Sequence, residues 1–143
     1  MFEHRNTFDF HVVPFAGSPA LSLIDPKNEH HAGVILNSGY NIQHTVDLRG
    51  DVEETNMHDF TVVDDGEHAL TLMKVPGLSS IAESSAVGYH GECNATWEGF
   101  KELKVRDSAV TFEWSAHGHI SLDESTRMTA SVEEMCENEW DFR

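Results

Sequence analysis

Short stretches of alternating apolar and polar residues, separated by turns, run along most of this chain. The stretch 7–13 alternates well enough to form a strand, which closes at Pro14 and Gly17. Three hairpins follow, and their strands cover 32–36 with 42–46, 60–63 with 69–73, and 100 onward with a strand ending at 114. The Asp65-Gly66 turn of the second hairpin is the strongest short-range hairpin signal present. The pattern predicts an all-β fold of antiparallel hairpins.

Two further segments have no strand pattern. The stretch 76–91 is rich in glycine and serine without a clear period, which is typical of a loop. Ser121-Leu-Asp-Glu124 has the form of a helix capping box, but no long amphipathic run follows it. We therefore expect a loop at the first segment and no more than a short helical turn at the second.

The spacing of the last two hairpins suggests a repeat. Phe100 follows Phe60 by 40 residues, close to the roughly 40–50 residues of one propeller blade. This spacing predicts an incomplete β-propeller, with chain for about three blades of the 4–8 that close the ring. We therefore expect a fragment of a longer protein, or a piece whose open edges are covered by other copies. A β-sandwich or a small barrel is the alternative that the same pattern allows.

Charge narrows the choice of partners. Nine Lys and Arg residues stand against 25 Asp and Glu residues, which gives a formal charge of −16. Such a surface repels nucleic acid and anionic membranes, so neither is expected as a partner. It also disfavours an anionic substrate unless local Lys and Arg residues offset it. No apolar run approaches the roughly 20 residues of a membrane helix, and residues 1–5 lack the pattern of a secretory signal.

The two cysteines leave an alternative open. Cys93 and Cys136 match no metal-binding spacing, so they are either two buried thiols or one disulfide. Asn94-Ala95-Thr96 is an N-glycosylation acceptor, which matters only in a secreted protein. Composition alone therefore leaves the compartment unassigned.

Histidines are the main candidates for chemistry. There are ten in the 143 residues, and they cluster at 30–31, at 58 and at 117–119. Clustered imidazoles serve metal binding, proton transfer or nucleophilic attack. Because equivalent strand ends of a propeller converge on its axis, His58 and His119 can meet there, and His31 is a weaker candidate. We assign ordinary surface or loop positions to the others that stand apart, namely His4, His11, His44, His68 and His90.

Five segments, in matching order, resemble the arylsulfotransferase (ASST) propeller family in its fungal branch. They are His31-Ala-Gly-Val-Ile-Leu-Asn-Ser-Gly-Tyr40, Asn56-Met-His-Asp-Phe60, Trp97-Glu-Gly-Phe-Lys-Glu-Leu103, Val110-Thr-Phe-Glu-Trp-Ser-Ala-His-Gly-His119 and Glu139-Trp-Asp-Phe142. Lys101 stands where the family has glutamine, and Gly118 stands where it has aspartate. The resemblance implies one partial propeller domain over 1–143, and it is strongest over 30–143.

The resemblance implies a six-bladed propeller that transfers a sulfuryl group from an aryl sulfate to a phenolic acceptor. A histidine is transiently sulfated, with no nucleotide cofactor and no metal. His58 and His119, and more weakly His31, would be the channel histidines. The small-molecule partners would be the aryl sulfate and the phenol. Family members are secreted or membrane-associated, and that compartment is carried over only by analogy.

The chain departs from the family pattern at its last motif, and the sequence also allows two alternative functions. The chain ends at Arg143, where the family's Trp-Asp-x-x-His motif would supply another histidine, so we expect this polypeptide to be inactive by itself. One alternative is a propeller-type binding or structural fragment without catalysis. The other is a cupin-like, metal-dependent β-barrel, because His117-x-His119 and Glu124 have the spacing of its metal ligands. Against a cupin, Thr111 stands where its glycine belongs.

Overall fold

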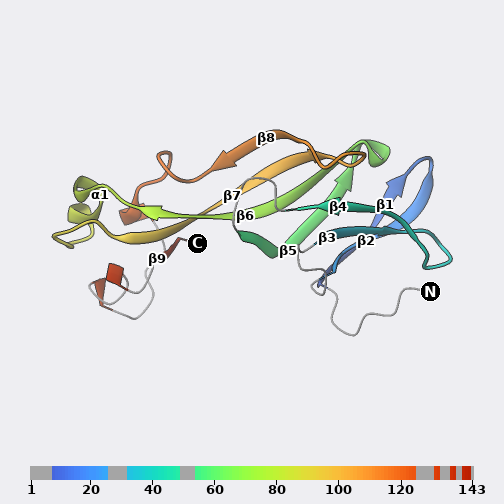
Figure 1. The fold of residues 1–143 in the computed structure, drawn as a ribbon. Helices are drawn as coiled ribbons and strands as arrows, with labels where there is room; N and C mark the ends of the chain where they lie inside the picture. Colours follow the sequence, from blue (N-terminus) through green and yellow to red (C-terminus); the bar gives the residue numbers. More distant parts are fainter. Residues whose placement is uncertain are drawn as a thin grey trace. The chain divides into compact units, whose positions relative to one another are not determined.

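The computed structural model describes residues 8–25, 32–48, 54–124, 131–132, 136–137 and 140–142. Strands predominate among them and form two mostly antiparallel sheets (Figure 1), which confirms the all-β prediction. The chain divides into two compact units. The first unit comprises 1–73 and 100–114, and the second comprises 74–99 and 115–143.

The first sheet is a four-stranded meander in chain order, formed by β1 (Phe8–Phe15), β2 (Ser18–Asp25), β3 (Ala32–Leu36) and β4 (Ile42–Asp47). Leu23 pairs with Val34 across β2 and β3. The predicted first strand and the β3–β4 hairpin are confirmed. β2 was not predicted, because its Ser18-Pro19 start has the composition of a turn.

The second sheet repeats this order with β5 (Glu54–Val63), β6 (His68–Leu78), β7 (Asn94–Lys104) and β8 (Val110–Ser115), while β9 (Trp140–Phe142) pairs in parallel with β7. The hairpins predicted at 60–73 and 100–114 are confirmed, with longer strands than expected. Asp64 and Asp65 have positive φ in the turn η1 (Asp64–Gly66). That left-handed turn is what the Asp-Gly signal predicts.

The predicted repeat has the wrong phase. Phe60 lies on β5 and Phe100 on β7, and these strands belong to one sheet. Their spacing therefore relates two hairpins of a single sheet and does not mark a blade. The described residues form one four-stranded and one five-stranded sheet, where about three blades were predicted, and no closed sheet is seen. The unit that repeats is the whole meander, which begins once at Phe8 and again at Glu54.

Phe60 lies at the centre of a core shared by both sheets in the first unit. Its side chain is fully buried, and its ring lies so close to Gly33 that a Cβ atom there would approach it to 2.4 Å. Only glycine leaves room for this contact. The core consists of Val13, Ala20, Ile24, Ile35, Val46, Leu48, Phe60, Val62, Ala69, Leu103 and Val105, with Phe15 packed against it.

The opposite face of the first sheet is also apolar. Leu23, Val34 and Leu36 are buried there, with Leu21 packed against them. Neighbouring residues of a strand point to opposite faces, so β2 supplies apolar side chains to both. All five residues of β3 are buried. The two central strands of this sheet are therefore apolar on both faces.

Polar contacts add to the packing between the sheets. The Asp65 carboxylate accepts hydrogen bonds from the Gly17 N–H at 2.9 and 3.0 Å. The His44 Nε2–H donates to the Val105 carbonyl at 2.6 Å. Each contact joins a residue of the first four-stranded segment to a turn that follows a strand of the second sheet. The sheets are thus held at their ends as well as through their core.

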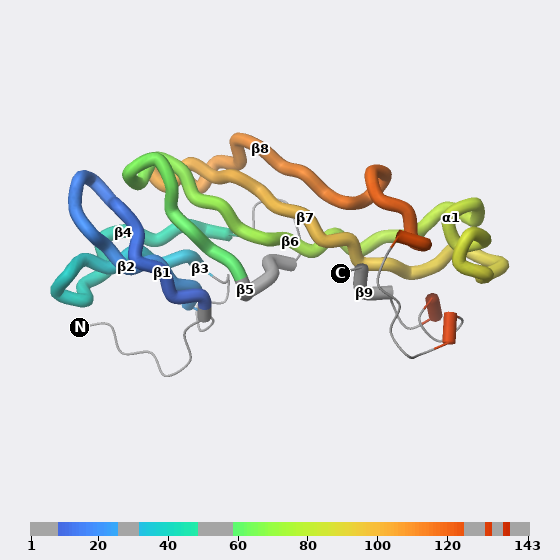
Figure 2. Tube along the Cα trace, turned by 180° about the vertical axis from the view of Figure 1, so that it is seen from behind, coloured from blue at the N-terminus to red at the C-terminus, as the bar shows by residue number. Residues whose placement is uncertain are grey.

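The second unit contains α1 (Ile81–Ala86), which lies in the connection between β6 and β7 (Figure 2). The Ser80 hydroxyl accepts from the Glu83 N–H, and the Glu83 carboxylate accepts from the Ser80 N–H at 2.9 Å. The loop predicted for 76–91 is therefore wrong in part, because it contains the end of β6 and this capped helix. The expected helical turn at Ser121 is confirmed as η2 (Leu122–Glu124). Among the described helices, none is long and apolar enough to span a bilayer.

A disulfide joins Cys93 to Cys136, which decides between the two alternatives left by the sequence. Both cysteines are buried. Cys93 is also fixed through its backbone, because its N–H donates to the Ser79 hydroxyl and its carbonyl accepts from the Ser79 N–H. The bridge thus connects the start of β7 to the C-terminal part of the second unit.

Removing the disulfide should destabilise the protein. The bridge spans 43 residues, and closing such a loop restricts the unfolded chain by about 2–4 kcal/mol. We expect the free energy of unfolding of the double variant Cys93→Ser, Cys136→Ser to be lower by this amount, so that it unfolds at a lower urea concentration. Wild type in reductant is the control and should match the variant. Equal stability of the variant and the oxidised wild type contradicts this expectation.

Gly33→Ala should destabilise the shared core, because the added methyl group overlaps the Phe60 ring. Overpacking of this kind costs about 1–3 kcal/mol in urea unfolding. Phe60→Leu in the same chain removes the ring, so the double variant should lose less than the sum of the two single losses. Strictly additive losses would show that the two positions do not touch.

Candidate functional site

The three histidines predicted to form a channel site are not seen together. His31 lies outside the described residues, and so does the side chain of His58, although the backbone of His58 belongs to β5. His119 is exposed in the turn after β8, where its N–H donates to the Ala116 carbonyl at 3.0 Å. β5 belongs to the first unit and His119 to the second. Their meeting in one channel therefore stays a prediction.

Beside His58 in the chain, Asp59 takes part in a different polar group. Asp59 on β5 meets Asp9 and His11 on β1, with one oxygen or nitrogen atom of each side chain within 4.8 Å of the others. His11 Nε2 lies 2.6 Å from Asp9 Oδ1, a hydrogen bond in which the ring nitrogen donates. The other Asp9 oxygen accepts the backbone N–H of Phe60. We call Asp9, His11 and Asp59 the carboxylate–histidine group.

The backbone of β1 is irregular at this group. Its register with β2 shifts between Phe8 and His11, and Asp9 has a φ of 54°. Bulges re-aim side chains and are common next to functional sites. Here the irregular residue is the one whose carboxylate bonds to both His11 and Phe60.

The surroundings of the carboxylate–histidine group disfavour the ionised form of Asp59. Partial burial is the largest cause that raises the pKa of Asp59 above its usual range, and the nearby Asp9 carboxylate raises this pKa further. His11 acts in the opposite direction. Two carboxylates held close together favour a shared proton or a bound cation between them. The group can therefore hold a positive species at the edge of the core.

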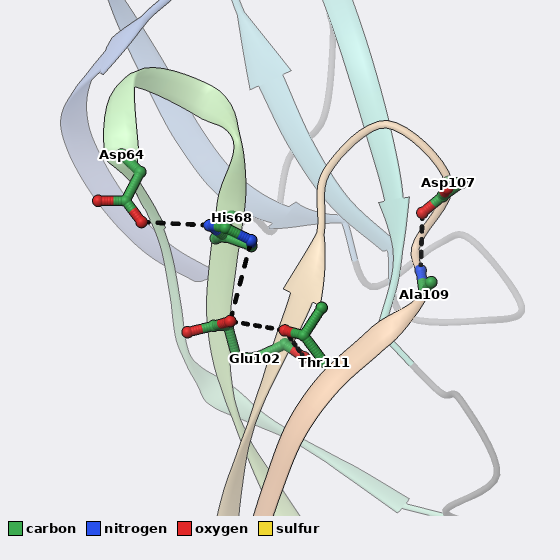
Figure 3. Close-up of polar contacts among 6 residues, drawn as sticks. All are labelled: Asp64, His68, Glu102, Asp107, Ala109 and Thr111. Atoms are coloured by element: carbon green, nitrogen blue, oxygen red, sulfur yellow. Dashed lines mark hydrogen bonds and ion pairs between the residues drawn. The ribbon is translucent and has the colours of Figure 1, made fainter.

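A second polar group crosses the strands of the second sheet (Figure 3). His68 Nδ1 lies 3.1 Å from Asp64 Oδ2, and His68 Nε2 lies 4.0 Å from Glu102 Oε1. The Thr111 hydroxyl donates to the same Glu102 oxygen at 2.6 Å. His68 also lines a pocket of about 380 Å³ together with Gly66, Glu67, Lys104 and Arg106. With a carboxylate facing each ring nitrogen, this imidazole acts as a bridge between strands rather than as a free nucleophile.

The close-up in Figure 3 also contains the turn after β7. The Asp107 carboxylate accepts the Ala109 N–H at 3.2 Å. That bond is the largest cause that lowers the pKa of Asp107, and Arg106 lowers it further. Because Asp107 is exposed, the contact shapes the turn and adds no functional group to the pocket.

The cupin-like spacing gains no support from the described residues. The His117 ring packs on Trp97, with ring centroids 4.2 Å apart. The Glu124 carboxylate instead accepts hydrogen bonds from the N–H and hydroxyl of Ser121, both at 3.1 Å. Within the part of the chain that the structure describes, the carboxylate–histidine group alone gathers three possible metal ligands.

Sequence reasoning missed both polar groups, since His11 and His68 were assigned to ordinary surface positions. A signal for the first group was present: Asp9 and His11 are two positions apart on a predicted strand and so share a face. A third partner from β5 could not be inferred from local spacing, because Asp59 lies 48 positions after His11.

Comparisons with protein-family models, with curated proteins and with solved structures gave no match. The arylsulfotransferase resemblance therefore rests on the five sequence segments quoted above. The geometry of the carboxylate–histidine group stands independently of that resemblance.

Asp59→Asn should stabilise the protein at neutral pH. The folded-state pKa of Asp59 lies above its ordinary value of 3.8, so the folded state holds its proton more tightly than the unfolded chain does. The contribution of Asp59 to stability therefore falls as pH rises from about that value through the raised pKa. Urea unfolding in the presence of EDTA should show the variant more stable at pH 7, with the difference disappearing in acid. If the variant is less stable than the wild type at pH 7, the predicted direction of the stability change is wrong.

Proposed function

We propose that the two sheets are consecutive blades of an arylsulfotransferase-like β-propeller that functions in sulfuryl transfer. The observation that carries the proposal is the first sheet, whose central strands bury apolar side chains on both faces. In a two-sheet sandwich the outer face of each sheet contacts water and is polar. A propeller blade instead packs against a neighbouring blade on each side.

The first strands of the two sheets support the same arrangement. β1 packs along β5, and these strands carry the carboxylate–histidine group. In a propeller, one equivalent strand of every blade borders the central channel. His58 stands on β5 next to Asp59, so the proposal assigns His58 and the carboxylate–histidine group to the channel side.

The second sheet offers a surface for a further blade. The Phe100 ring lies between those of Phe112 and Trp114, with ring centroids 5.7 and 5.8 Å apart. Phe100 is 40% exposed and Phe112 is 51% exposed. Contiguous exposed apolar groups mark interaction surfaces. In the proposed propeller this aromatic surface packs against the next sheet.

The proposed chemistry has two balanced steps. A neutral imidazole nitrogen attacks the sulfur of an aryl sulfate, an N–S bond forms, the S–O bond to the aryl group breaks, and the phenolate leaves. The oxygen of an acceptor phenol then attacks the same sulfur, the N–S bond breaks, and the phenol proton passes to water or to the departed phenolate, which leaves the imidazole regenerated. Neighbouring cationic or hydrogen-bonding groups stabilise charge on the three equatorial oxygens. His58, His119 and His31 are the candidates for the attacking group.

Two blades do not enclose an axis, since closure takes about 4–8. The described sheets therefore supply part of a channel and not a complete one. We expect the first step to proceed slowly on a nucleophile carried by these sheets. Repeated turnover requires the stabilising groups of further blades. After the one equivalent of phenol released on labelling, the purified chain should therefore release phenol from a chromogenic aryl sulfate no faster than buffer does.

Covalent labelling tests the function directly. Incubation of the chain with p-nitrophenyl sulfate should add the mass of one SO₃ group to a histidine, as an acid-labile adduct located by peptide mass spectrometry. We expect the label at His58, His119 or His31, and its loss when the labelled residue is changed to asparagine. His90→Asn is the matched control, because His90 is exposed and lies outside the proposed channel.

Two outcomes contradict the proposal. If no histidine is labelled, or if His90 is labelled as fast as the three candidates, the histidines have no special reactivity. The non-catalytic alternative, a propeller piece that binds through its aromatic surface, then accounts for the molecule better. Steady turnover by the chain alone would show that two sheets suffice, contrary to the geometric argument.

A further inference from the structure

The carboxylate–histidine group brings together two oxygen donors and one nitrogen donor from separate strands. Asp9 and His11 come from β1 and Asp59 comes from β5, and their ligand atoms lie within 4.8 Å of one another. All three residues are partly buried. The Asp9 side chain is only 11% exposed, whereas that of His11 is 43% exposed. The Asp9 end of the group is therefore largely shielded from water, and the His11 end is open to solvent.

One member of the group is held in place by the fold. The Phe60 N–H donates to one Asp9 oxygen, which leaves the other oxygen directed at His11. Phe60 is itself fully buried in the shared core. A ligand fixed by a backbone hydrogen bond from a rigid core is the kind of support that metal sites use. The donor set is thus positioned before any ion arrives.

The charges of the group call for a cation. Two carboxylates stand together at a partly desolvated position, and one imidazole faces them at 2.6 Å. A divalent ion placed between the two carboxylates offsets both negative charges.

We propose that Asp9, His11 and Asp59 form a binding site for a divalent transition-metal ion of the Zn²⁺ or Mn²⁺ class. Imidazole nitrogen combined with carboxylate oxygen suits these ions, whereas Ca²⁺ and Mg²⁺ prefer oxygen ligands throughout. The side chains supply three ligands, and water or a bound molecule completes the coordination through the open side at His11. The site does not depend on sulfuryl transfer and stands or falls separately from it.

The test is calorimetric titration of the folded, metal-free chain with Zn²⁺, together with thermal unfolding in Zn²⁺ and in EDTA. We expect one saturable site and a higher melting temperature in Zn²⁺. Asp59→Asn and His11→Gln should each weaken binding at least about 10-fold, since even supporting residues of metal sites contribute that much. Both changes conserve size, and the exposure of His11 makes His11→Gln tolerable for folding.

Two controls separate this site from other histidines that bind Zn²⁺ weakly. His119→Gln removes the His-x-His spacing after β8, and His90→Gln removes an exposed histidine of the second unit. Neither should change the affinity of the saturable site. A tenfold excess of Mg²⁺ should not displace Zn²⁺, because Mg²⁺ gains little from an imidazole ligand.

The proposal is overturned by any of three results. These are no saturable Zn²⁺ site in the wild type, equal affinity in wild type, Asp59→Asn and His11→Gln, or loss of the site in His119→Gln. Displacement by Mg²⁺ overturns the assigned class of ion. Melting temperatures of the variants in EDTA show that each is folded, so a lost site cannot be confused with a lost fold.

Discussion

The contact between the Phe60 ring and Gly33 is the constraint on which the first unit depends. Only a residue without Cβ lets β3 approach the ring, and the ring in turn fills the core that the two sheets share. Because Phe60 is fixed, its N–H is fixed as well, and it holds the Asp9 carboxylate across the strands. The next residue back along β5, Asp59, is thereby set beside Asp9 and His11. Core packing and the polar group are two consequences of one contact.

Placement at the edge of a rigid core explains how two carboxylates can stay close together. Their mutual repulsion and partial desolvation oppose the arrangement, as the raised pKa of Asp59 reflects. The buried apolar residues around Phe60 stabilise the sheets enough to offset that cost. Unfavourable electrostatics maintained by good packing is a common property of functional sites. This is why the carboxylate–histidine group, rather than the exposed His119 turn, is the best-defined candidate for chemistry in the described residues.

The local sequence pattern was sufficient to predict the hairpins but not to predict how they group into sheets. Alternation predicted β1, and turns between two short strands predicted β3–β4 and β5–β6, because these signals act within a few residues. β2 begins with Ser18-Pro19, which has the composition of a turn. α1 is a short capped helix of six residues within a stretch that has the composition of a loop. Neither element was therefore predicted. The capping box at Ser80 has the same form as the one recognised at Ser121. The repeat was placed out of phase because two hairpins of one sheet have blade-like spacing. The group of Asp9, His11 and Asp59 depends on sheet-to-sheet packing, which no local pattern contains.

Phe60 packs against Gly33 and so places Asp59 beside Asp9 and His11. Nuclear Overhauser effects in the folded chain measure this most directly. We predict strong cross-peaks between the aromatic protons of Phe60 and the α-protons of Gly33, with the Gly33 resonances displaced by the ring current. We also predict cross-peaks from the His11 ring protons to the β-protons of Asp59. If the Phe60 ring instead shows contacts only within its own sheet, the two sheets do not pack as described, and the carboxylate–histidine group does not form.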